Sequence, residues 1–428
     1  MTAGGGHGAV SHRLVCTGCG RSLADEGTTL RCPTCADASL LRTDYGPQPF
    51  RPRSAAAGIF RYGFWLPARH EVPGSSAPHV YRSERIGRAL GLSELWISFS
   101  GYWPERDCRM ESGTFKELEA YSVLARLPQD AGTMVLASAG NTAAAFLSAF
   151  RDLPFPSILV IPDSALPTVR TIPTAACARV IALAGATYNQ AITYSKRLTD
   201  ADPEFFDEGG VRNVGRRDGL ATVMLAAYEA IQRLPDYYVQ AVGSGAGAIA
   251  AFEAALRIAR TSGQATTLPR LLLCQNSRHA PLRDRWNRHV VDPCARAPLD
   301  VYAPELVNTT PPYETHGGIR DILLRSHGDV LTAGQRTADE AAAAFEELEG
   351  IDIERPAAIA LACLREAVIR RHIPPDACVL LNVTGGGRRR YRAAQPTKAS
   401  PRHQHPRIDH LRPDSEPKTG ALRAPFLR

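Results

Sequence analysis

Residues 238–257, YVQAVGSGAGAIAAFEAALR, place an apolar strand, a glycine-rich turn and an alanine-rich helix in direct succession. Short apolar runs that read as further strands lie at 95–99, 133–137, 157–161, 180–183, 271–274 and 378–383. Helical stretches lie at 115–127, 142–150, 221–233, 248–260, 338–348 and 356–371. This alternation predicts an α/β protein with a largely parallel sheet.

The glycine-rich turn is a candidate phosphate site, because bare backbone N–H groups at a helix N-terminus attract anions. It consists of Gly243, Ser244, Gly245, Ala246 and Gly247. A dinucleotide-binding turn would need an acidic residue at the end of the following strand, and residues 271–274 end without one. A turn with no ligand remains the alternative.

Two more turns lie where a parallel sheet gathers its ligands, beyond the carboxyl ends of strands. Residues 138–142, SAGNT, offer backbone N–H groups to a carboxylate, and Asn141 either binds a phenolic oxygen or only caps the helix. Thr384 ends the last strand in TGGG, and Lys116 follows Thr114 and Phe115 at a helix start. An amine, a carboxylate loop, a phosphate cradle and a hydroxyl for a pyridine nitrogen together predict a pyridoxal phosphate (PLP) site.

The N-terminal region contains two cysteine pairs with the spacing of a metal-binding ribbon. Cys16-x-x-Cys19 and Cys32-x-x-Cys35 supply four thiolates, which fill a tetrahedral site and leave no position open for water. They predict a structural Zn²⁺ site, with a degenerate or iron-bearing ribbon as the alternative. The ribbon lacks the cluster of basic and aromatic residues that nucleic-acid binding needs.

The net charge of +7 is concentrated at the C-terminus of the 428 residues. Residues 388–428 carry eleven Lys and Arg against three Asp and Glu, whereas the preceding residues carry 39 against 40. We therefore expect a ribbon and N-terminal extension at 1–45, a catalytic core at 46–387 with a smaller mobile subdomain near 130–225, and a basic disordered tail at 388–428. No apolar run long enough to span a membrane and no apolar leader are present, so a cytoplasmic protein is expected.

Longer motifs carry a family resemblance over residues 14–387. The chain resembles the cysteate synthases, fold-type II PLP enzymes related to threonine synthase, in FSGYWPER (99–106), TFKELEAY (114–121), RNVGRRDG (212–219), PPYETHGGIRD (311–321) and VLLNVTGGG (379–387). The resemblance implies a tryptophan synthase β-like fold with two open parallel-sheet domains, assembled as a homodimer. It also implies a transferase that makes L-cysteate and phosphate from O-phospho-L-serine and sulfite through a bound aminoacrylate, a reaction of coenzyme M biosynthesis.

The same resemblance assigns roles to individual residues. Lys116 becomes the Schiff-base lysine and moves the α-proton, Asn141 binds the ring oxygen, residues 243–247 bind the cofactor phosphate, and Thr384 faces the pyridine nitrogen. The substrate site is assigned Thr114, Ser138, Gly140, Thr142, Arg106 and Arg216, with Arg212, Arg217, His316 and Arg320 as further cationic candidates. Thr114 and Ala246 depart from the family pattern, since Ser and a hydroxyl residue are usual there.

Three other functions remain open on sequence alone. They are a threonine synthase acting on O-phosphohomoserine, another O-phosphoserine-dependent β-replacement enzyme, and a zinc-ribbon protein that binds nucleic acid through the basic tail. The last would require Lys116 to be inert, although all four cofactor segments are intact.

Overall fold

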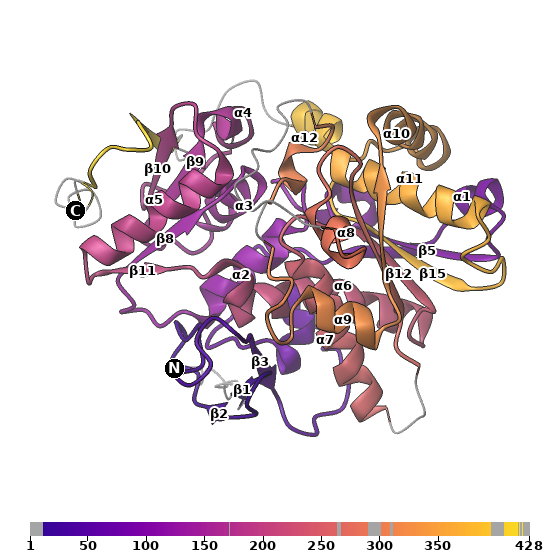
Figure 1. Cartoon of the computed structure of the whole chain (residues 1–428), viewed down its shortest axis with the longest axis horizontal. Coiled ribbons are helices and arrows are strands. Elements are labelled where there is room, and N and C mark those ends of the chain that lie inside the picture. The colour runs from indigo at the N-terminus through magenta and orange to yellow at the C-terminus, as the bar shows by residue number, and fades with distance from the viewer. Residues whose placement is uncertain are drawn as a thin grey trace.

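Two parallel sheets form the core of the computed structural model, which describes residues 12–170, 172–262, 267–289, 301–308, 311–394, 406–417, 419 and 422. The larger sheet has the order β14-β13-β12-β15-β5-β4, and the smaller has the order β11-β8-β9-β10-β16. Every neighbouring pair is parallel except β4 and β5. The predicted fold class is therefore confirmed. Figure 1 shows the two sheets side by side, with the ribbon below them.

The larger sheet consists of β4 (His79–Arg82), β5 (Glu94–Phe99), β12 (Tyr237–Ala241), β13 (Arg270–Asn276), β14 (Asp329–Ala333) and β15 (Cys378–Val383). The smaller sheet consists of β8 (Thr133–Ala137), β9 (Ser157–Pro162), β10 (Ala178–Leu183), β11 (Phe205–Asp207) and β16 (Arg407–Leu411). β9, β10 and β15 are buried along their whole length, as expected for parallel strands covered on both faces. β6 (Tyr102–Trp103) and β7 (Cys108–Arg109) pair with each other as a separate two-stranded antiparallel sheet.

Three helices lie at the centre of the molecule and connect the two sheets. α2 (Lys116–Arg126) and α7 (Ala246–Thr261) both pack on α6 (Val214–Ile231), whose first fourteen residues are all buried. The other helices are α1 (Glu84–Leu90), α3 (Asn141–Ala149), α4 (Leu166–Val169), α5 (Tyr188–Ala201), α8 (Pro281–Trp286), α9 (Ile319–Arg325), α10 (Gln335–Glu349), α11 (Arg355–Ile369) and α12 (Arg388–Ala394). Short 3₁₀ turns lie at Gly58–Trp65, Pro104–Arg106, Asp163–Ala165, Gly210–Arg212 and Pro304–Leu306.

The predicted strands and helices agree closely with the structure, with one clear exception. α6 begins at Val214, seven residues before the predicted start at 221. Its first turns contain Arg216, Arg217 and Asp218, whose side chains are buried in ion pairs. α6 also packs on α7, which directly follows β12 of the larger sheet.

The C-terminal region corrects a further prediction. Residues 388–428 were expected to be disordered, yet Arg388–Ala394 form α12 directly after TGGG and Arg407–Leu411 form β16 on the edge of the smaller sheet. Residues 395–405, 418, 420–421 and 423–428 of that expected tail lie outside the described residues. β16 pairs with β10 from Arg407 to Leu411, and Arg179 of β10 forms an ion pair with Asp409 at 2.7 Å. The basic, proline-rich composition of this region predicted disorder. The strand forms because it pairs with β10, which lies more than 200 residues earlier in the chain.

The ribbon is a three-stranded antiparallel sheet of β1 (Arg13–Cys16), β2 (Ser22–Leu23) and β3 (Leu41–Asp44). Leu14 and Leu41 pack with Val214 at the start of α6, which attaches the ribbon to the core. Residues 1–11 of the expected N-terminal extension lie outside the described residues. Within the described ranges, no helix has the length and apolar character needed to cross a membrane.

Candidate active site

One cavity at the carboxyl ends of the strands brings the four predicted cofactor segments together. Its walls include Thr114–Lys116, Ser138, Asn141, the whole turn from Gly243 to Gly247, and Thr384. Segments that are up to 270 residues apart in sequence therefore face the same space of about 850 Å³, open solvent at its mouth included. Tyr188, Gln240, Glu305, Asn308 and Glu354 also line it, and no motif had marked them.

The glycine turn has the geometry of an anion cradle. α7 begins at Ala246 after Gly245, which has no side chain to cap it, and the Ala246 N–H makes only a long 3.5 Å contact with Ser244 Oγ. The first turn of α7 can therefore offer N–H groups to an anion. Gly245 has φ +79°, and a Cβ at Gly247 would approach Gln240 Nε2 to 2.6 Å. The positive φ disfavours a side chain at Gly245, a Cβ at Gly247 would require Gln240 to shift, and the backbone N–H groups of this turn suit a phosphate group such as that of PLP.

The SAGNT turn is shaped by its own side chains. Ser138 Oγ accepts hydrogen bonds of 3.0 Å from the N–H groups of Gly140 and Ala143, and Gly140 has φ +130°. Thr142 Oγ1 donates to Glu119 Oε1 at 2.9 Å, so its proton is directed away from a substrate carboxylate. The assignment of Ser138, Gly140 and Thr142 to carboxylate binding would therefore rely on the Ser138 hydroxyl and on backbone N–H groups.

Lys116 lies at the first position of α2 and lines the cavity. Its Nζ donates to Glu119 Oε2 at 3.2 Å. Burial lowers the pKa of Lys116 and Arg216 lowers it further, while Glu119 opposes them. A lowered pKa makes the neutral amine, the form that attacks a carbonyl, more accessible than in an exposed lysine.

Arg216 lines the cavity as predicted, but its donors are occupied by two buried carboxylates. Its Nη1 donates to Glu119 Oε1 at 2.9 Å, while its Nε donates to Glu208 Oε1 at 3.1 Å and its Nη2 to Glu208 Oε2. Burial opposes the charge on Arg216, yet the two carboxylates outweigh it and raise the pKa of the guanidinium. Arg216 is thus held in place before any substrate arrives.

The remaining cationic candidates do not line this cavity, which corrects the expected cationic pocket. Arg106 lies over the Trp103 ring at 5.5 Å. Arg212 and Arg217 donate to backbone oxygens of the ribbon, the His316 carbonyl accepts from Leu40 N–H, and Arg320 lies 4.0 Å from Glu314. Consecutive residues of α6 point in different directions, so Arg216 reaches the cavity while Arg217 reaches the ribbon.

An arginine from the expected tail lies at the edge of the site. Arg388, the first residue of α12, forms an ion pair with Glu354, and its Nη2 lies 3.4 Å from Asn141 Oδ1. Both partners line the cavity. Sequence analysis missed Arg388, because it was counted among eleven basic residues of a segment that was predicted to be disordered.

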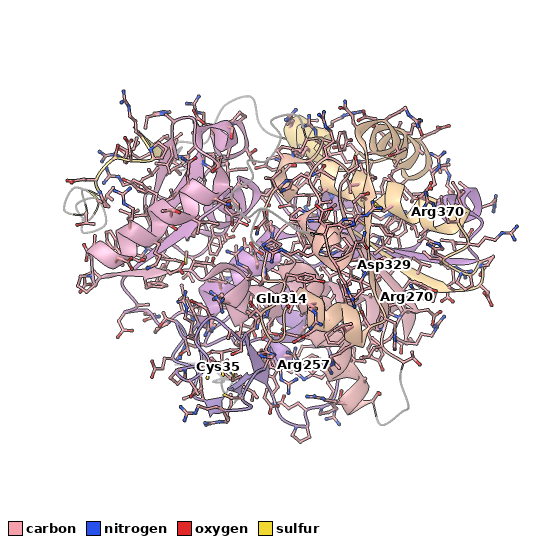
Figure 2. The ribbon with its side chains drawn as sticks, viewed as in Figure 1. Cys35, Arg257, Arg270, Glu314, Asp329 and Arg370 are labelled. Carbon is pink, nitrogen blue, oxygen red and sulfur yellow. The ribbon has the colours of Figure 1, made fainter. Side chains whose placement is uncertain are left out.

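The four ribbon cysteines form one cluster. The sulfur atoms of Cys16, Cys19, Cys32 and Cys35 all lie within 4.8 Å of one another, and Figure 2 labels Cys35 among them. Four sulfur atoms around a tetrahedral Zn²⁺ would lie roughly 3.8 Å apart, because each Zn–S bond is about 2.3 Å. The donor set therefore fits the predicted metal.

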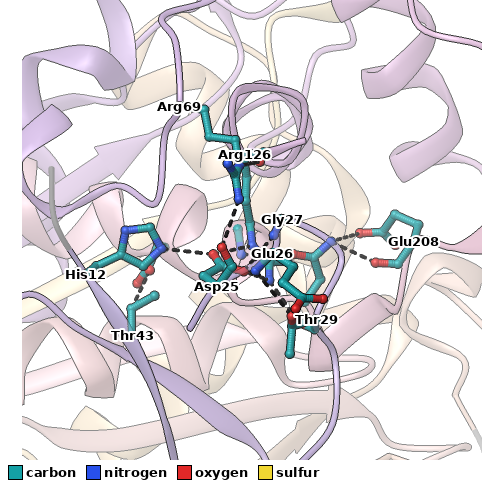
Figure 3. Close-up of polar contacts among 12 residues, drawn as sticks. His12, Asp25, Glu26, Gly27, Thr29, Thr43, Arg69, Arg126 and Glu208 are labelled. Atoms are coloured by element: carbon teal, nitrogen blue, oxygen red, sulfur yellow. Dashed lines mark hydrogen bonds and ion pairs between the residues drawn. The ribbon is translucent and has the colours of Figure 1, made fainter. Parts of the chain in front are cut away.

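A buried ion pair joins the ribbon to the catalytic core (Figure 3). Asp25, between the two cysteine pairs, accepts from Arg126 Nη2 at 2.6 Å and from Arg126 Nε at 2.9 Å. Arg126 Nη1 donates at 2.8 Å to Asn213, which caps α6 and in turn donates to the Glu208 carbonyl at 2.7 Å. Polar contacts thus run from the ribbon to the carboxylate that holds Arg216.

Comparison with known proteins agrees with this site. The model of a pyridoxal-phosphate dependent enzyme family matches residues 81–385. The cysteate synthase of Methanosphaerula palustris is 42% identical over 385 residues, covering 88% of this chain and 90% of that protein. The cysteate synthase of Methanospirillum hungatei is 40% identical, covering 90% and 92%.

Solved structures show the same fold at low identity. Threonine synthase from Escherichia coli has a TM-score of 0.62 and 14% identity, covering 94% of this chain and 97% of that one. A PLP-dependent aspartate racemase has a TM-score of 0.55 and 16% identity, covering 72% and 89%. Together, the matched family model, the close relatives and the assembled cavity show that the chain belongs to the cysteate synthase family of pyridoxal-phosphate-dependent enzymes.

Proposed function

We propose that the protein converts O-phospho-L-serine and sulfite to L-cysteate and phosphate. The supporting observation is the meeting of Lys116, Asn141, the 243–247 turn and Thr384 at one cavity, in a chain about 40% identical to cysteate synthases. PLP, when bound, would withdraw electrons from the substrate's α-carbon. Lys116 would hold it covalently, Asn141 would bind its ring oxygen, the 243–247 turn its phosphate, and Thr384 would face its pyridine nitrogen.

Lys116 would carry the proton through both halves of the reaction. Once the substrate's amino group has displaced Lys116 from the cofactor, the freed amine would take the α-proton, and phosphate would leave the β-carbon with the electrons of the C–O bond. The sulfur of sulfite forms a bond to the same β-carbon, and Lys116 returns the proton to the α-carbon. A hydroxyl at Thr384 leaves the pyridine nitrogen largely unprotonated, which favours this replacement over transamination.

Recognition of the two anions would involve Arg388 and the backbone N–H groups of the cavity turns. Arg388 has a half-buried side chain beside Asn141, and a guanidinium suits phosphate and sulfonate oxygens. Arg216 would act on the anions through its positive charge and not through direct hydrogen bonds, because its donors already bind Glu119 and Glu208. Thr114 would lie at the substrate site through its place beside Lys116 in the cavity wall.

The ribbon would bind one structural Zn²⁺ through Cys16, Cys19, Cys32 and Cys35. All four ligands come from the protein, so the ion would stabilise the ribbon and take no part in the reaction. The enzyme would assemble as a homodimer, which size-exclusion chromatography with light scattering would test.

Product analysis tests the proposed reaction. PLP-loaded enzyme would be given O-phosphoserine with and without sulfite, and separately O-phosphohomoserine, with mass spectrometry of the products. Cysteate that forms only with sulfite, and is absent with Lys116→Ala, is the expected result. Threonine from phosphohomoserine without any cysteate would instead make the protein a threonine synthase.

A further inference from the structure

Glu119 lies within the TFKELEAY motif (114–121), was assigned no role there, and contacts three groups of the cavity wall. It lies three residues after Lys116 on α2 and is fully buried. Its Oε2 accepts from Lys116 Nζ at 3.2 Å, and its Oε1 accepts from Thr142 Oγ1 and from Arg216 Nη1, both at 2.9 Å. These partners come from α2, α3 and α6, so one side chain fixes the relative position of three elements.

The spacing along α2 explains the contact with the lysine. Residues i and i+3 lie on the same face of a helix, so the two side chains meet beside the first turn. Thr142 and Arg216 then restrain Oε1 from the other side. Thr142 and Arg216, which take no part in the proposed proton transfer, therefore orient the carboxylate. Its other oxygen, Oε2, accepts from Lys116, which does take part.

The charges around Lys116 give Glu119 a specific electrostatic role. Arg216 of α6 and Glu208, which follows β11, also act on Lys116, and Tyr188 of α5 lines the same cavity. Glu208 directs both of its oxygens to Arg216. Among the described residues, Glu119 is the carboxylate in an ion pair with Lys116, and it favours the protonated amine that burial disfavours.

We propose that Glu119 is the positioning residue of this active site: it holds Lys116 at the α-carbon of the substrate and stabilises the ammonium that Lys116 becomes on taking the α-proton. The inference rests on the role of Lys116 in the proposed function. Proton transfer is balanced, because the proton that Lys116 takes from the α-carbon is the one it later returns. The α-proton moves only between the α-carbon and Lys116, and Glu119 touches neither substrate nor product.

The experiment follows the α-proton and does not depend on cysteate formation. Holoenzyme is incubated with O-phospho-L-serine in D₂O without sulfite, and NMR records loss of the α-proton signal while a phosphate assay records elimination. The variants are Glu119→Gln, which keeps the shape and removes the charge, and Glu119→Asp, which keeps the charge and shortens the side chain. Glu253→Gln is the matched control, because Glu253 is a carboxylate of α7 paired at 3.2 Å with Arg217, the neighbour of Arg216, outside the cavity wall.

We expect Glu119→Gln to lower the rate of α-proton loss by roughly 10- to 100-fold, the range for a misplaced catalytic group. In a plot of this rate against pH, the fall on the acid side should move to lower pH. The reason is that loss of the carboxylate lowers the pKa of the Lys116 amine, which must be neutral to take the proton. Glu119→Asp should lose rate while its fall on the acid side moves less, and Glu253→Gln should keep the wild-type rate and pH profile.

Wild-type rate and pH profile in folded Glu119→Gln would overturn the inference. If that variant does not fold, an unchanged rate in Glu119→Asp would overturn it in the same way. Proton loss without cysteate on later addition of sulfite would reject the proposed function and leave the Glu119 comparison valid. No proton loss in the wild type would reject both.

Discussion

Asp25 of the ribbon and Arg126 of α2 form a two-point ion pair whose side chains are 4% and 1% exposed. Burial opposes ionisation of Asp25, but hydrogen bonds from His12 and Arg126 outweigh it and lower the pKa of Asp25 below its usual range. The pair is therefore charged under ordinary conditions. It links the four-cysteine ribbon to the helix that begins with Lys116.

Removing one partner of this pair should destabilise the protein strongly. Asp25→Asn leaves Arg126 as a buried cation without its carboxylate, at an expected cost of about 3 kcal/mol in the free energy of unfolding. Denaturant unfolding would measure the loss. Arg31→Gln, which removes an exposed ion pair with Asp37 in the same ribbon, is the control and should change stability by less than about 1 kcal/mol. Equal losses in the free energy of unfolding for the two substitutions would show that the buried pair stabilises the protein no more than an exposed one.

Glu117 should make stability depend on pH. Burial raises the pKa of Glu117 to about 8, and Ser112 N–H, which donates to its carboxylate, opposes the shift. A carboxyl with a raised folded-state pKa favours folding while it is protonated. This contribution is present below the unfolded-state pKa of about 4.3 and is lost as pH rises toward 8.

The free energy of unfolding of Glu117→Gln, relative to that of the wild type, should therefore be higher at pH 8 than at pH 5. Thermal unfolding of both proteins at the two pH values would measure the difference. A constant difference across this range would mean that Glu117 ionises normally in the folded state.

The cysteine cluster should bind one metal ion per chain. Elemental analysis of purified protein should find about one equivalent of zinc, and Cys32→Ala should lose most of it because a buried ligand is removed. The melting temperature should fall as well, because the ribbon packs on Val214 of α6. Cys177→Ala, outside the cluster, should retain the zinc, and loss of zinc there would contradict the assignment.

The C-terminal strand should contribute to the stability of the smaller sheet. Deletion of residues 396–428 would remove β16 and expose the edge of β10, which favours both unfolding and edge-to-edge association. We expect a lower melting temperature and more aggregation by light scattering. Arg179→Met, which breaks the 2.7 Å pair with Asp409, should show part of the same loss. A truncated chain with wild-type stability would show that β16 is dispensable.

Much of the architecture could be predicted because it depends on local patterns. The strand from Tyr238, its glycine turn and the following helix were readable, since apolar runs, glycine and alanine act on their own neighbours. Lys116, Asn141 and Thr384 were found through motifs that end strands or begin helices. The smaller sheet's fifth strand was missed, because β16 pairs only with a distant partner.

The sequence by itself determined the fold class, the four cysteines that cluster in the ribbon and the four segments that meet at the cavity, because each depends on residue types at short spacing. Tertiary structure alone decided which charges meet. It directed Arg216 to Glu119 and Glu208, Arg217 to the ribbon and Arg388 to Asn141. The physical reason is that an ion pair depends on a few ångströms of separation in space, and packing brings together side chains that sequence distance leaves unrelated.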